Sequence, residues 1–379
     1  MFGPQGRRIF ILLMLFACAL MQLAAECDSG NEKSALDEND EIIGDLDDDD
    51  DDDDTTDDDT ADDDTADDDT VDDDTGDDDI EVTLPVTPEV LVSGFDTSEG
   101  IAFVPETNRM FIVAKELDVD HGGVYEVFAD GSTAQFVELN SPVGMVYNGD
   151  GLLLVGEFGD DSGVDTINDG SVMAVDLAEQ KAYEYGDKIP DANFLVLRPD
   201  GSVLVSDDFS DKIYEVPNGG GDATNWLKGD LVYSNGMVFA PDGMTLYVAR
   251  SFKNYFGPIP VPDNRIFQVS LDSPYGDPVE ATLLAEVGDK STPDGLAMDE
   301  NGKIYVCANT NGTVIRFDPI TLEQEVVAED LGGVASLAWG TGGDFPETTL
   351  YATRLFAGEV VAMPIGVRSA KLGYEITAP

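Results

Sequence analysis

Histidine, cysteine and positive charge are scarce in this sequence, and each scarcity excludes a class of function. The one histidine, His121, lies in a Gly-rich segment that is predicted to be a turn, so the chain lacks the ligands of a zinc or copper site. The three cysteines are too few for a disulfide framework. Cys307 lies in an apolar run, where we expect a buried and unreactive thiol.

Negative charge dominates the chain and is concentrated at one end. Lysine and arginine number 19, against 79 aspartates and glutamates. Residues 1–80 hold 31 of the acidic side chains and three of the basic ones, which leaves 48 acidic and 16 basic side chains in the remainder. Such a surface repels phosphate backbones and anionic headgroups. We therefore expect no nucleic-acid partner, and cations are the favoured ligands.

Residues 1–26 have the pattern of a secretory signal. Arg7 and Arg8 precede an apolar stretch that is short for a membrane span, so we expect export. Cys27 follows as a lipid-modified cysteine would in a bacterial lipoprotein, although Glu26 departs from that pattern. A lipid-anchored cell-envelope protein and a secreted or periplasmic protein are both open, and the anchor would be its only membrane contact.

Residues 27–84 form a low-complexity segment with almost nothing apolar enough for a core. An unbroken aspartate run is followed by a five-residue repeat that contains three aspartates and a threonine. Self-repulsion and low hydrophobicity predict a disordered, extended linker. Loose binding of divalent cations is the alternative, without the fixed geometry of a site.

Six repeats occupy residues 85–379 and predict an all-β, six-bladed β-propeller. Each repeat has an apolar strand, a tight turn and a second strand, as in 100–103 and 110–113, and then a third strand with alternating apolar residues. Several of the turns contain Asp-Gly or Asn-Gly pairs. The repeats begin 41 to 59 residues apart, which is typical of four-stranded blades around a channel. A helical solenoid is excluded because no apolar period of 3.6 residues is sustained.

One position in each repeat is predicted to face the propeller axis, because the innermost strand of every blade runs along the channel. These axial residues are Glu99, Val143, Asn193, Asn235, Asp294 and Ala335. Four of the six carry oxygen donors, and two carboxylates with two amides suit one divalent cation, most simply Ca²⁺. The alternative is that Asn and Asp are common where a turn precedes glycine. Four such residues at one repeat position favour the cation site.

Three segments that contain axial residues resemble the signature segments of the gluconolactonase, regucalcin (senescence marker protein) and luciferin-regenerating-enzyme family. The segments are residues 97–100, 234–243 and 293–299. The resemblance spans the whole propeller, and it implies that Glu99, Asn235 and Asp294 hold one calcium or other divalent ion. It also implies that Asn193 faces the ion or its substrate. Members of the family are typically metal-dependent lactone hydrolases, so Asp294 would be the general base.

One segment departs from the family's pattern. The family usually has Arg, any residue, Asn and Asp, whereas this chain has Asp191-Ala192-Asn193-Phe194, so the arginine that contacts substrate in relatives is missing. Arg250, at the end of a strand in another blade, is the candidate for a substrate-binding cation, and a loop anchor is its alternative role.

The leading interpretation of the sequence is an exported, monomeric hydrolase of a small-molecule lactone or ester. The runner-up is a non-catalytic, metal-containing propeller that acts as a binding module at the cell surface. A quinone-dependent dehydrogenase is disfavoured because the chain has few of the arginines and histidines that its cofactor would need.

Overall fold

The part of the chain that carries the predicted propeller is seen in a computed structural model. The model describes residues 82–115, 121–158, 170–207, 209–229, 231–254 and 261–371. The predicted signal sequence, Cys27 and nearly all of the predicted linker lie outside these residues. Within the described ranges the only helix is a 3₁₀ turn, η1 (Pro105–Thr107), so none is long and apolar enough to cross a membrane.

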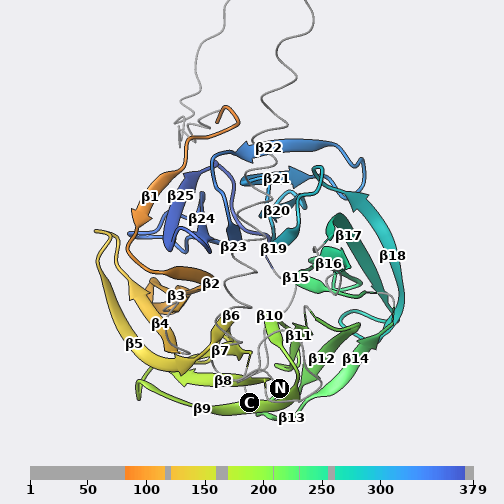
Figure 1. Ribbon diagram of the computed structural model, residues 1–379, viewed down its shortest axis with the longest axis horizontal. Coiled ribbons are helices and arrows are strands. Elements are labelled where there is room, and N and C mark those ends of the chain that lie inside the picture. The colour runs from red at the N-terminus through yellow and green to blue at the C-terminus, as the bar shows by residue number, and fades with distance from the viewer. Residues whose placement is uncertain are drawn as a thin grey trace, which may run out of the picture.

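Six sheets surround a common centre, as Figure 1 shows. The innermost strands are β2 (Thr97–Val104), β6 (Pro142–Tyr147), β10 (Ala192–Leu197), β15 (Ser234–Phe239), β19 (Pro293–Met298) and β23 (Val334–Trp339). The second strands are β3 (Arg109–Lys115), β7 (Leu152–Glu157), β11 (Val203–Asp207), β16 (Thr245–Asn254), β20 (Ile304–Ala308) and β24 (Thr349–Arg354). The third strands are β4 (His121–Val127), β8 (Gly170–Asp176), β12 (Lys212–Val216), β17 (Val261–Leu271), β21 (Thr313–Phe317) and β25 (Glu359–Pro364). The fourth strands are β5 (Thr133–Asn140), β9 (Lys181–Ile189), β14 (Thr224–Lys228), β18 (Pro278–Glu286), β22 (Gln324–Ala328) and β1 (Glu89–Val92).

Each sheet is one blade, and the blades are numbered one to six from β2. The inner strand of every blade packs against the inner strand of the next, and β23 of blade six contacts β2 of blade one. The ring is therefore closed, which confirms the predicted six-bladed propeller. His121 begins strand β4 and its backbone pairs with Asn140, so the prediction of a turn at this histidine is wrong.

Blade six takes its outer strand from the other end of the described chain. β1 pairs in antiparallel register with β25, where Glu89 lies opposite Ala362 and Val90 opposite Val361. This pairing ties the first strand to the last and closes the circle, as the adjacent labels β1 and β25 in Figure 1 show. Blade two also gains a short fifth strand, β13 (Gly221–Asp222), which runs parallel to β9.

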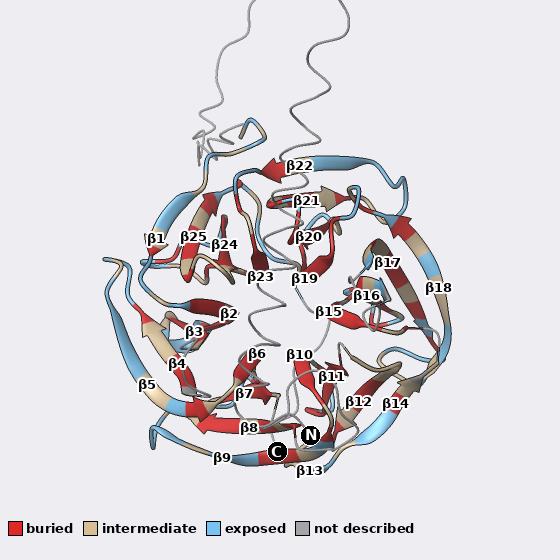
Figure 2. Ribbon diagram, in the orientation of Figure 1, coloured by how far each residue is buried: buried red, intermediate tan, exposed pale blue. Residues whose placement is uncertain are grey.

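The hydrophobic core lies between the blades. Apolar side chains form six clusters among the described residues, and each cluster joins two neighbouring blades. Phe111 of blade one and Leu153 of blade two, for example, share a cluster and are fully buried. Figure 2 shows buried residues along the inner strands and exposed ones along the outer strands. Cys307 is buried in the cluster between blades five and six, and its burial raises the pKa of the thiol, as predicted for an unreactive cysteine.

Candidate metal and substrate site

The axial residues are brought close together by glycines that lie against the next blade. A Cβ atom on Gly100 would come within 2.7 Å of the carbonyl oxygen of Val143. Other glycines that approach the next axial carbonyl in this way are Gly144 at Asn193, Gly236 at Asp294 and Gly295 at Ala335. Only glycine permits this approach, because any side chain would push the neighbouring strand away. The inner strands therefore converge tightly at the level of the axial residues.

Every blade also has an irregular strand register at its axial residue. In blade one, Ser98 pairs with Ala114 and Ile101 with Ile112, so that Glu99 and the following glycine lie opposite a single residue of β3. The same break occurs at the axial residue of all five other blades. Such a bulge redirects side chains and is frequent beside functional sites. Here it frees each axial residue from the regular ladder.

Glu99, on the inner strand of blade one, lies beside a lysine of the same blade. The Nζ atom of Lys115 is 3.6 Å from Oε2 of Glu99, and their side chains are 23% and 13% exposed. Burial raises the pKa of Glu99, and the ammonium of Lys115 opposes that shift. The carboxylate is thus held in a poorly solvated place that favours a nearby cation.

Asp294 is the second axial carboxylate and is buried. Its Oδ2 atom accepts a hydrogen bond of 3.0 Å from Nδ2 of Asn309, the residue that follows β20. Burial first, and then the negative charge of Glu99, raise the pKa of Asp294 well above its ordinary value. The two carboxylates belong to blades five and one, so their mutual repulsion means that both face the same central space.

The two axial asparagines complete the set of oxygen donors. Asn193 and Asn235 are buried, and Oδ1 of Asn235 has no hydrogen-bond partner among the described residues. A buried acceptor without a donor is costly, and a bound cation would satisfy it. In the described part of the chain, no three His, Cys, Asp or Glu side chains gather as a metal site. The axial set contains only two residues of those types, and its other oxygens come from amides, which suit a hard cation such as Ca²⁺.

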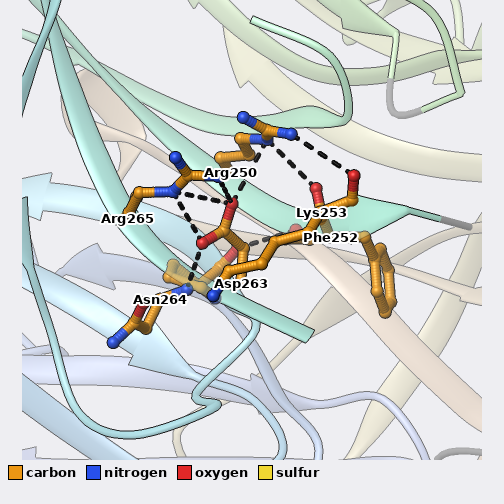
Figure 3. Close-up of polar contacts among 8 residues, drawn as sticks. Arg250, Phe252, Lys253, Asp263, Asn264 and Arg265 are labelled. Atoms are coloured by element: carbon orange, nitrogen blue, oxygen red, sulfur yellow. Dashed lines mark hydrogen bonds and ion pairs between the residues drawn. The ribbon is translucent and has the colours of Figure 1, made fainter. Parts of the chain in front are cut away.

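Arg250 is anchored within blade four, as Figure 3 shows. Its Nε atom lies 3.2 Å from Oδ2 of Asp263 and donates to the carbonyl oxygen of Phe252 at 3.1 Å. The buried carboxylate of Asp263 also accepts three hydrogen bonds from Arg265, of 2.8, 3.0 and 2.6 Å. These contacts match the alternative role of Arg250 as a loop anchor. A direct contact of Arg250 with substrate stays a prediction.

Lys115 and Asn309 were missed from the sequence, although the repeats contain the signal for both. Ile101 and Leu296 are the first apolar residues of their inner strands after the axial glycine, and each pairs with a residue of the second strand. Lys115 and Asn309 lie three residues after those partners. Extending the repeat comparison to the end of the second strand would have placed both residues beside the axis.

One family model matches most of the propeller. The family model described as the SMP-30/Gluconolactonase/LRE-like region matches residues 97–353, from β2 to β24. The chain belongs to this family. The match includes every axial residue, so the resemblance of the three signature segments is confirmed at the level of the family.

Solved structures related to the SMP-30/gluconolactonase family share the fold. A gluconolactonase of Xanthomonas campestris is 18% identical, over 73% of this chain and 88% of its own, with a TM-score of 0.55. A calcium-binding protein, regucalcin, of Agrobacterium tumefaciens is 18% identical, over 77% and 98%, with a TM-score of 0.58. A luciferin-regenerating enzyme is 14% identical, over 76% and 99%, with a TM-score of 0.55.

A curated sequence relative matches a smaller part. An uncharacterised protein of Sulfolobus acidocaldarius is 27% identical over 103 residues, which are 27% of this chain and 33% of that protein. The match thus spans about a third of the relative's length.

Proposed function

We propose that this protein is a divalent-metal-dependent hydrolase of lactones or related esters, and that Ca²⁺ is its ion. The observation that carries the proposal is the buried ring of oxygen donors on the propeller axis, in which Oδ1 of Asn235 has no partner among the described residues. Membership of the SMP-30/gluconolactonase family supports it. Two proteins of the same fold, a gluconolactonase and a calcium-binding protein, support it as well.

Glu99, Asn235 and Asp294 are the proposed ligands, and Asn193 is proposed to face the ion or the substrate. A bound divalent ion would polarise the lactone carbonyl and lower the pKa of a nearby water. The donor set fits such an ion because it contains two carboxylates and two amides, all held on rigid inner strands. The substrate in this proposal is a small molecule, and the protein acts as a monomer.

Asp294 is the proposed general base. Its carboxylate lies among the proposed ligands, and the hydrogen bond from Asn309 fixes its orientation. Asp294 would take a proton from water as the water oxygen bonds to the carbonyl carbon. The ester C–O bond then breaks, and the proton passes to the departing alkoxide, which yields the hydroxy acid.

Chelation and one substitution test the proposal. The full chain would be incubated with sugar, homoserine and aromatic lactones, with calcium and with chelator. We expect chelator-sensitive hydrolysis that Asp294→Asn reduces by at least about 100-fold, the scale of general-base catalysis. Asp242→Asn, at an exposed turn, is the matched control and should retain activity. Calcium binding without turnover of any lactone would instead favour the non-catalytic binding module, for which the altered segment at Asp191 is the supporting observation.

Export is part of the proposal and rests on the sequence of residues 1–26. Attachment of a lipid at Cys27 is one of its two forms, and secretion without an anchor is the other. Metabolic labelling with radioactive palmitate distinguishes them. Label that is present in the full chain and absent from Cys27→Ser means a lipoprotein, and unlabelled protein in the medium or periplasm means simple secretion.

A further inference from the structure

A second set of positions, the rim positions, surrounds the axial residues. In each blade, the inner-strand residue two positions after the axial residue pairs with a residue of the second strand. The rim position lies three residues after that second-strand partner. The rim positions among the described residues are Lys115, Phe158, Ser251, Asn309 and Leu355. By repeat equivalence, each lies at the axial end of its own blade.

The rim positions match the axial residues in chemical character. Charged Glu99 has Lys115 at its rim position, 3.6 Å away, and Asp294 has Asn309, which donates a hydrogen bond of 3.0 Å to it. Apolar Val143, by contrast, has Phe158. The apolar side formed by blade two therefore lies next to the charged side formed by blade one.

Lys115 connects these two sides. Its Nζ atom lies 5.1 Å from the centroid of the Phe158 ring, close enough for a cation–π contact, while it also pairs with Glu99. Phe158 packs against Phe209 of blade three in an edge contact, with ring centroids 6.3 Å apart. Both phenylalanines are only half-buried. Lys115, Phe158 and Phe209 together form an aromatic wall with a fixed ammonium beside the axial site.

We propose that this wall makes the enzyme select lactones with an apolar aromatic or alkyl part over polyhydroxylated sugar lactones. The proposal rests on the proposed lactonase function. A sugar lactone would bring its hydroxyl groups against aromatic rings that cannot accept or donate an ordinary hydrogen bond, so those hydroxyl groups would lose their hydrogen bonds to water. An aromatic lactone would instead pack on Phe158 and Phe209. The ammonium of Lys115 has three donors, so it has a donor for a substrate oxygen while it pairs with Glu99.

Two lactones test the selection in the full chain with calcium. We expect kcat/KM to be at least about tenfold higher for dihydrocoumarin, an aromatic lactone, than for δ-gluconolactone. Phe158→Ser should lower that ratio about tenfold, mainly through KM for dihydrocoumarin. Phe128→Ser, at a phenylalanine that is 41% exposed, should leave the ratio unchanged. A wild-type preference for δ-gluconolactone, or an unchanged ratio in Phe158→Ser, would overturn the proposal.

The role of Lys115 can be tested by calcium affinity as well as by activity. Lys115→Met removes a positive charge from beside Glu99, so it should tighten calcium binding several-fold by calorimetry and raise KM for dihydrocoumarin. Lys115→Arg should stay near wild type in both, and Lys181→Met, at a side chain that is 71% exposed, serves as the control. A lysine with only a structural role would change the unfolding midpoint and leave calcium affinity and KM unmoved, which would contradict its place in the wall.

Failure of the wall and failure of the proposed function give different results. If the full chain hydrolyses neither lactone, the proposed lactonase function is wrong. Binding of lactam analogues, which are not cleaved, then tests whether the aromatic wall selects apolar ligands. Calorimetry should show tighter binding of dihydroquinolinone than of gluconolactam, and Phe158→Ser should abolish the difference. Equal or reversed affinities of the wild-type protein would refute the wall.

Discussion

Asn309 donates a hydrogen bond from Nδ2 to Oδ2 of Asp294 over 3.0 Å, and both side chains are buried at the axial end of blade five. The bond joins a residue that follows the second strand to the proposed base on the first strand. It therefore fixes the position of the carboxylate relative to the second strand of the blade.

Asn309→Ala should slow catalysis more than it unfolds the protein. Loss of the donor leaves Oδ2 of Asp294 without this partner, so we expect kcat to fall about tenfold, in line with the loss of one hydrogen bond to a charged group. Steady-state kinetics on the preferred lactone measures the effect. Asn301→Ala, in the exposed hairpin at the other end of the same blade, should be unchanged. Equal effects of the two variants would contradict the orienting role of Asn309.

Gly236→Ala should destabilise the propeller. The new Cβ would collide with the carbonyl oxygen of Asp294 and with Gly295, both of which are backbone groups that cannot rotate away. We expect a loss of about 2–3 kcal/mol in the free energy of unfolding, measured by urea denaturation. Gly302→Asn is a suitable control, because open space surrounds Gly302 and asparagine tolerates its positive φ of 78°. A wild-type midpoint for Gly236→Ala would mean that the inner strands can separate at little cost.

Asp207 should make stability depend on pH. This buried carboxyl ends β11, and burial raises its pKa from 3.8 to about 6. The folded protein therefore binds more protons than the unfolded chain between these two values, so the free energy of unfolding falls as pH rises from about 4 to about 6. Above that range the penalty is constant.

Asp207→Asn should remove this titration. We expect the variant to be more stable than wild type at pH 7 by on the order of 2–3 kcal/mol and to lose the slope between about pH 4 and 6. Urea denaturation across this range measures both, with Asp200→Asn, an exposed turn residue of the same blade, as the control. Lower stability of Asp207→Asn at pH 7 would show that the charge has a favourable partner.

Two valines of strand β1 allow a matched test of how much this strand stabilises the closed ring. Val92 is 3% exposed and packs in the cluster between blades six and one, whereas Val90 on the same strand is 55% exposed. Val92→Ala should cost about 1–2 kcal/mol of unfolding free energy, and Val90→Ala less than about 0.5. If denaturation midpoints of the two variants coincide, the buried side chain of β1 does not stabilise the closure.

Much of this fold was predictable because a propeller repeats its local pattern. The alternation of apolar residues and the Asp-Gly and Asn-Gly turns placed the first three strands of each blade correctly. Equivalence by repeat also led to the axial residues, since one position in six copies has to meet around one axis. The family resemblance followed from the segments around Glu99, Asn235 and Asp294 and is borne out by the family model.

The features that were missed depend on contacts between distant segments. β1 is four residues long and lies some 270 residues before β25, and nothing in its sequence indicates that β25 is its partner. Lys115 and Asn309 belong to second strands, where the hairpin register decides which side chain reaches the axial residue. The anchoring of Arg250 by Asp263 depends in the same way on the pairing of β16 with β17.

The β1–β25 ladder also decides how the domain meets mechanical load. A pull on the chain from its N-terminal side reaches β1 before any other strand, and that strand is held by a short ladder with a break in register after Val90. Upstream of it, one hydrogen bond of 2.8 Å from the backbone N–H of Val86 to the carbonyl oxygen of Val327 ties the segment to blade five. Under tension the propeller would therefore come undone at this bond and then along the β1–β25 seam, before the hairpins of the other blades separate.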